Sequence, residues 1–145
     1  MKRLFLGCAL VLISAIFLLY SQEEVHEFKG HHFVASYSGC NHEALSDVET
    51  LKKVMLMAVE TCGATVLDAV DYVFHPDGLT MVILLSESHA SIHTYPEYDA
   101  CFVDLFTCGD KCSAEKFDLA LREYLHPKQI AQKMLLRQQT VEVRP

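Results

Sequence analysis

Apolar residues recur at three- and four-residue steps in two segments of the chain, which is the spacing of a helix with one buried side. The first segment has these positions at Leu51, Val54, Met55, Ala58, Val59 and Cys62. A capping box at residues 46–49 predicts where this helix begins, and Gly63 predicts where it ends. The second segment begins near Ser113 and ends at the His126-Pro127 pair. The pattern therefore predicts two helices.

Four other segments have the composition of strands, with either alternating or continuously apolar residues. They are residues 31–37, 64–74, 79–85 and 100–107. A Pro-Asp-Gly turn separates the second from the third, and residues 129–143 are predicted as an edge strand. This β-α-β-β-β-α-β order predicts an α+β fold, a two-layer sandwich in which a mainly antiparallel sheet carries two helices on one face.

An N-terminal hydrophobic segment precedes this predicted fold. Lys2 and Arg3 are followed by an uncharged apolar run at residues 4–20. The pattern predicts a hydrophobic leader or membrane anchor over residues 1–22 and one domain over residues 23–145. Because no clean A-x-A cleavage site follows the run, a retained membrane anchor is favoured over a removed export signal.

The charge of the predicted domain excludes one class of partner. The 145-residue chain has a formal net charge of −7, and both cations of the leader lie outside the domain. Residues 23–145 therefore carry 10 Lys and Arg against 19 Asp and Glu, a net of about −9 (10 − 19). An acidic domain of this kind is not expected to bind nucleic acid.

The number and positions of the cysteines indicate in which cellular compartment the domain is found. Of the six cysteines, Cys8 lies in the apolar segment and the other five are an odd number, so a fully disulfide-paired domain is excluded within one chain. Cys62 and Cys101 occupy apolar positions of a predicted helix and a predicted strand, as reduced thiols often do. Reduced thiols fit the cytosol better than an exported domain. Two localisations therefore stay open: a membrane-anchored protein, or a cytoplasmic one with a misassigned start.

Three reactive side chains lie close together in the sequence between residues 85 and 110: Ser88, His93 and Cys108. A hydroxyl or thiol becomes a nucleophile when a base is within reach, and these residues could converge across adjacent strands. Structural explanations, such as a turn hydroxyl, a core imidazole and a buried thiol, stay open at this point. A zinc site is not expected, because the HASIH segment at residues 89–93 lacks the glutamate of an H-E-x-x-H motif.

A longer motif contains these residues. The run S-E-S-H-x-S-I-H-T-x-P-E-Y at residues 86–98, followed by V-D-L-F-T-C-G-D at residues 103–110, resembles the processing and catalytic signature of the prokaryotic S-adenosylmethionine decarboxylases. These are self-cleaving, pyruvoyl-dependent enzymes. The similarity covers about residues 30–110 and excludes the leader.

The resemblance implies a role for each residue of the motif. The self-cleaved bond falls between Glu87 and Ser88, and Ser88 becomes the pyruvoyl group that forms a Schiff base with the substrate. His93 is implied as the base of processing, and Cys108 as the proton donor of decarboxylation. The proenzyme, or zymogen, would yield a β chain of residues 1–87 and an α chain of residues 88–145.

Two further site residues are implied less directly by the same resemblance. Glu97 matches an acidic residue near the substrate, and Thr80 matches a hydroxyl residue that is tied to processing. The pyruvoyl group is generated from the chain itself, so neither a metal nor pyridoxal phosphate is expected. Family members of this type are homodimers of cleaved protomers with active sites at the subunit interface.

The implied reaction releases CO₂ from S-adenosylmethionine and gives the aminopropyl donor for spermidine, a polyamine. The connection at residues 74–78 is shorter than is usual in the family, where this loop supplies an aromatic contact to the adenine ring. A homologous pyruvoyl-dependent ornithine or arginine decarboxylase is therefore one alternative. A membrane-tethered homologue without activity is another.

Overall fold

The computed structural model describes residues 25–108 and 111–142. The predicted leader at residues 1–22 lies outside these ranges. Among the described residues, no helix is both long enough and apolar enough to cross a membrane. Residues Lys29–Gln138 form one compact unit.

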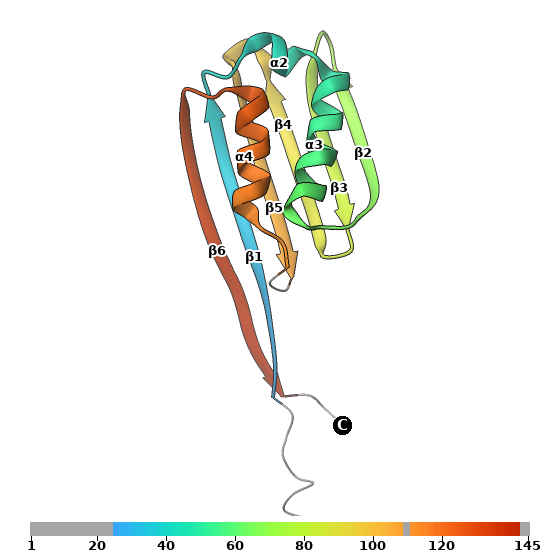
Figure 1. Cartoon of the computed structure of the whole chain (residues 1–145), viewed down its shortest axis with the longest axis vertical. Helices are drawn as coiled ribbons and strands as arrows, with labels where there is room; N and C mark the ends of the chain where they lie inside the picture. Colours follow the sequence, from blue (N-terminus) through green and yellow to red (C-terminus); the bar gives the residue numbers. More distant parts are fainter. Residues whose placement is uncertain (1–24, 109–110, 143–145) are drawn as a thin grey trace, which may run out of the picture. The chain divides into compact units, whose positions relative to one another are not determined.

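A six-stranded antiparallel sheet forms the main part of the fold, and its spatial order is β2-β3-β4-β5-β1-β6 (Figure 1). The strands are β1 (Val25–Ser38), β2 (Val66–Phe74), β3 (Gly78–Leu85), β4 (Ser88–Tyr95), β5 (Ala100–Cys108) and β6 (Gln129–Glu142). The helices are α2 (His42–Ser46), α3 (Val48–Cys62), α4 (Ala114–Leu125) and the 3₁₀ turn η1 (Pro96–Tyr98). The two longer helices, α3 and α4, lie on the same face of the sheet (Figure 1). The predicted α+β class is confirmed.

The helix ends differ in one detail from the sequence prediction. Asp47, not Ser46, is the N-cap of α3, and its carboxylate accepts a hydrogen bond of 3.1 Å from the Thr50 N–H. Ser46 instead ends the short helix α2, which the hydrophobic pattern did not predict because five residues are too few to show a period. Gly63 ends α3 in the left-handed conformation, as predicted, and Ser113 caps α4.

Strand β4 was not predicted as a separate element. Its sequence, SHASIHTY, alternates small or apolar residues with polar ones and has no apolar run. Ala90 and Ile92 are fully buried on the helix side of the sheet, while His89 and His93 occupy the alternating positions. The strand is central, so pairing with β3 and β5 holds it in place despite its polar sequence.

The two faces of the sheet have different surroundings. On the helix side, alternating residues of the central strands are buried with α3 and α4 in one core. We call the other side of β1 to β5 the open face. It bears exposed large apolar side chains, namely Val70, Tyr72, Phe74, Val82, Leu84 and Phe102. Apolar residues gathered in this way are typical of an interaction surface.

A buried polar contact connects α4 to β1. The Tyr37 hydroxyl, which is 1% exposed, donates a hydrogen bond to the carboxylate of Asp118. Arg122 pairs with the same carboxylate at 2.5 Å. Burial, followed by the hydrogen bond to Asp118, raises the pKa of Tyr37 well above its usual range. The contact satisfies the polar groups that the core would otherwise leave without partners.

We predict that Gly63→Ala destabilises the fold. Gly63 has φ +96°, and an added Cβ would lie 3.1 Å from the backbone oxygen of Lys111. A side chain in this left-handed conformation costs about 1–2 kcal/mol before any steric effect. Urea denaturation should show this loss, whereas Glu60→Ala, on the exposed side of the same helix end, should change the midpoint little. Equal stability of Gly63→Ala and the wild type would contradict the prediction.

Candidate functional site

The turn between β3 and β4 consists of Ser86 and Glu87 and is held by Thr65. The Glu87 carboxylate accepts hydrogen bonds from the Thr65 N–H at 2.9 Å and from the Thr65 hydroxyl at 3.3 Å. The Ser86 N–H donates in turn to the Thr65 carbonyl at 2.9 Å. The bond from the Thr65 N–H keeps the pKa of Glu87 below its usual range, so the carboxylate that accepts these hydrogen bonds is ionised at neutral pH. Ser88, the first residue after the turn, has φ 154°, a backbone conformation that residues with side chains rarely adopt.

The register of β4 with β5 places Cys108 beside the Glu87–Ser88 peptide bond. Ser88 pairs with Thr107, and the Cys108 N–H donates a 2.9 Å hydrogen bond to the Glu87 carbonyl. This carbonyl belongs to the peptide bond that joins Glu87 to Ser88. An N–H donor at this oxygen polarises the carbonyl and stabilises negative charge that develops on it. The Cys108 side chain is exposed.

His93 and Thr80 form a second cluster. They pair across β3 and β4, and the Thr80 hydroxyl lies 3.1 Å from the His93 Nδ1. His93 is five residues along β4 from Ser88, which corresponds to about 16 Å at the usual rise of ~3.3 Å per residue. The predicted convergence of Ser88, His93 and Cys108 therefore does not occur within the single chain. The structure brings Ser88 close to Cys108, and His93 close to Thr80.

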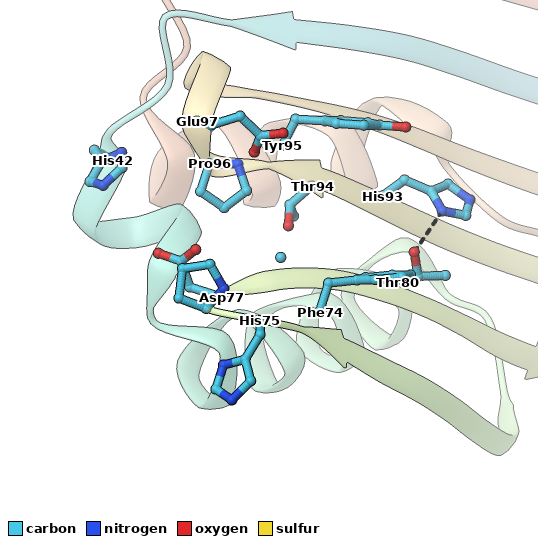
Figure 2. A pocket seen from close by; sticks show the side chains of 12 residues that line it. His42, Phe74, His75, Asp77, Thr80, His93, Thr94, Tyr95, Pro96 and Glu97 are labelled. Carbon is cyan, nitrogen blue, oxygen red and sulfur yellow. Dashed lines mark hydrogen bonds between the residues drawn. The ribbon is translucent and has the colours of Figure 1, made fainter.

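A cavity of about 610 Å³ opens beside the second cluster. Figure 2 shows Thr80 and His93 joined by a hydrogen bond at one side of this cavity and Glu97, from η1, at another. The other lining residues are His42, Phe74, His75, Pro76, Asp77, Gly78, Thr94, Tyr95 and Pro96. Thr80, His93 and Glu97 thus share one cavity, as far as the described residues show, whereas Ser88 and Cys108 do not line it.

Sequence reasoning missed the aromatic side of this cavity. Phe74, the last residue of β2, is 53% exposed and packs edge-on against Tyr72, with ring centroids 4.8 Å apart. The signal was present in the sequence, because Phe74 is the first residue of the short connection at residues 74–78. Strand β2, and not a longer loop, supplies the aromatic ring of Phe74 to the cavity.

Comparisons with known proteins point to one family. The sequence model of the family described as S-adenosylmethionine decarboxylase matches residues 31–138. The chain is 38% identical over 101 residues to an S-adenosylmethionine decarboxylase proenzyme of Methanococcus maripaludis, an alignment that covers 70% of this chain and 83% of the relative. The corresponding proenzyme of Brevibacillus brevis is 42% identical over 108 residues, covering 74% and 81% of the two chains.

The chain belongs to the S-adenosylmethionine decarboxylase family. The crystal structure of the adenosylmethionine decarboxylase from Aquifex aeolicus is similar in fold as well, with a TM-score of 0.70 and 33% identity over 76% of this chain and 91% of that one. The resemblance inferred from residues 86–110 is thereby confirmed at the level of the family. The decarboxylase family is pyruvoyl-dependent, and the Glu87–Ser88 bond lies within the matched residues.

We predict that Cys108 of this decarboxylase family member reacts first with an alkylating agent. Of the five cysteines among the described residues, Cys40, Cys62 and Cys101 are buried and Cys112 is partly buried. Burial raises the pKa of Cys112 to about 11 and that of Cys62 as well, while a hydrogen bond with the Cys40 thiol, followed by burial, raises that of Cys101. Among these five cysteines, peptide mapping after brief iodoacetamide treatment of the native protein should show carbamidomethyl first at Cys108. Faster modification of a buried thiol would contradict the structure.

Proposed function

We propose that this chain is a self-processing, pyruvoyl-dependent S-adenosylmethionine decarboxylase, and that Glu87–Ser88 is the bond it cleaves. The observation that carries the proposal is the Glu87 carbonyl, which accepts a hydrogen bond from the Cys108 N–H directly before Ser88. The membership in the decarboxylase family supports the same conclusion. Cleavage at this bond would divide the 145-residue chain into a β chain, residues 1–87, and an α chain, residues 88–145.

Processing begins with the Ser88 hydroxyl, which attacks the Glu87 carbonyl carbon and converts the peptide bond into an ester. The Cys108 N–H is placed to stabilise the charge on the carbonyl oxygen. The Thr65 clamp holds the turn in place during the attack. Removal of the Ser88 α-proton by His93 of a second copy of the chain then breaks the Cβ–O bond and releases the Glu87 carboxylate. The dehydroalanine that is left takes up water and loses ammonia to give the pyruvoyl group.

Cys108 and two residues of the cavity beside Thr80 and His93 suit the second reaction. The group supplies an electron-withdrawing carbonyl when CO₂ leaves the substrate. Cys108 is exposed and lies beside residue 88, where its thiol can return a proton to the product. Glu97 provides a carboxylate in the cavity and Phe74 an aromatic surface suited to a purine ring.

We further propose that two copies of the chain form a homodimer and that each active site contains residues from both. Ser88 and Cys108 lie about 16 Å along the strand from Thr80 and His93 in one protomer. The apolar side chains of the open face give a surface that a second copy would cover. A partner stacked on this face could place its own Thr80 and His93 beside Ser88.

We predict that the purified protein consists of two fragments, of 87 and 58 residues (145 − 87), and that Ser88→Ala is neither cleaved nor active. Without the hydroxyl no ester forms, because alanine has no nucleophile. Intact-mass spectrometry checks the cleavage, and release of labelled CO₂ checks the activity. An unbroken wild-type chain, or a Ser88→Ala variant that still decarboxylates, would refute the mechanism.

Cys108→Ala is the matched control for this experiment. It keeps the backbone N–H that bonds to the Glu87 carbonyl, so cleavage should persist while turnover falls because the proton donor is gone. Parallel assays with S-adenosylmethionine, ornithine and arginine identify the substrate. If the chain is cleaved but releases CO₂ only from ornithine or arginine, the pyruvoyl mechanism is supported and S-adenosylmethionine is not the substrate.

A further inference from the structure

We propose that His32, His89 and Asp104 form a binding site for a divalent transition-metal ion, preferably Zn²⁺, on the open face of the sheet. The three residues come from β1, β4 and β5, which are neighbours in the sheet order. Each can offer one ligand atom, and these atoms all lie within 4.8 Å of one another. The processing and decarboxylation steps proposed above do not use these three residues.

The strand register explains why residues far apart in the sequence meet here. His32 and His89 both pair with Phe106, His32 from β1 and His89 from β4. Asp104 lies two residues before Phe106 on β5 and therefore on the same face. The Phe106 ring contacts both imidazoles, with ring centroids 5.4 Å from His32 and 5.8 Å from His89. These contacts restrict the orientation of both histidines.

The distances between the ligand atoms fit a metal better than a direct ion pair. His32 Nε2 lies 3.6 Å and His89 Nε2 lies 3.4 Å from Asp104 Oδ2. A tetrahedral ion with ligands at about 2.0–2.1 Å separates its ligand atoms by about 3.3 Å. Both distances are too long for a good N–H···O hydrogen bond and are close to this tetrahedral edge.

The hydrogen bonds around the cluster leave the proposed ligand atoms free. The Ser91 hydroxyl donates to Asp104 Oδ1, which fixes the carboxylate and leaves Oδ2 toward the imidazoles. Asp104 Oδ2 and His32 Nε2 are buried without a hydrogen-bond partner among the described residues. Buried polar atoms without partners are costly, and a bound cation would satisfy both. A hydrogen-bonded carboxylate ligand is also what protein metal sites commonly use.

The ligand types select the class of ion. Two imidazole nitrogens and one carboxylate oxygen suit Zn²⁺ and its spectroscopic substitute Co²⁺, and they leave a fourth position open. The sequence predicted no metal anywhere in the chain, and the histidine pair considered there was His89 with His93 along one strand. The partners of His89 in the structure are instead His32 and Asp104, from two other strands.

Titration of the full chain, purified without a histidine tag, with Co²⁺ tests the proposal. We expect one Co²⁺ per chain, with the visible bands of a tetrahedral nitrogen and oxygen site and no thiolate charge-transfer band. Zn²⁺ should displace the Co²⁺. Asp104→Asn and His32→Gln should remove this binding, and Ser91→Ala should weaken it roughly 10- to 100-fold, as loss of a supporting hydrogen bond does in other metal sites.

His42→Gln is the matched control, because His42 also contacts a carboxylate, that of Asp99 at 3.0 Å, but lies outside the cluster. It should bind Co²⁺ as the wild type does. No binding by the wild type, a thiolate spectrum, or equal binding by all variants would overturn the proposal. Cleavage and CO₂ release are measured separately, so failure of the metal site would leave the proposed decarboxylase function untouched.

Discussion

The pairing of β4 with β5 places the Cys108 N–H at 2.9 Å from the Glu87 carbonyl, and the chemistry proposed for this chain depends on that hydrogen bond. A shift of one residue in this register would move the donor away from the carbonyl and turn every side chain of β4 to the other face. Buried Ala90 and Ile92 on the helix side make such a shift unfavourable. The apolar core therefore fixes the position of a polar reaction centre at the ends of two central strands.

One face of the sheet contributes to the stability of the fold, and the other carries the candidate functional residues. The helix side contains the apolar core and the Tyr37–Asp118 contact, which holds α4 against β1. The other side combines exposed apolar residues with the His32–His89–Asp104 cluster, and the cavity with Thr80 and His93 opens at one end of it. Polar residues can occupy this face because the folding core does not need it. If two copies pair through the open face, the same surface would bury apolar area and complete the active sites.

Local signals in the sequence were sufficient for the two longer helices, α3 and α4, and for the family. The periodic positions of α3, its end at Gly63 and the cap at Ser113 depend on neighbouring residues only, and each was predictable. Strand β4 was not, because its polar sequence is stabilised by the strands on both sides. The family signature at residues 86–110 is likewise contiguous, so it could be found without a structure.

Spatial relations between strands could not be predicted in the same way. Ser88 and His93 are close in sequence, but an extended strand separates them by about 16 Å. Conversely, His32 and Asp104 are 72 residues apart (104 − 32) and meet through the register of β1 with β5. Reactive residues that are neighbours in a strand therefore belong to different clusters, and a second copy of the chain is the proposed means of joining them.

Co-expression of the two variants Ser88→Ala and His93→Ala tests this central claim most directly. Neither variant should be cleaved alone, since one lacks the nucleophile and the other the base. In a mixed dimer, Ser88 of the His93→Ala chain meets the intact His93 of the partner chain, so mass spectrometry should show cleavage of the His93→Ala chain only. If that chain stays whole in the mixture while both variants are folded and dimeric, His93 does not act across an interface and the account is contradicted.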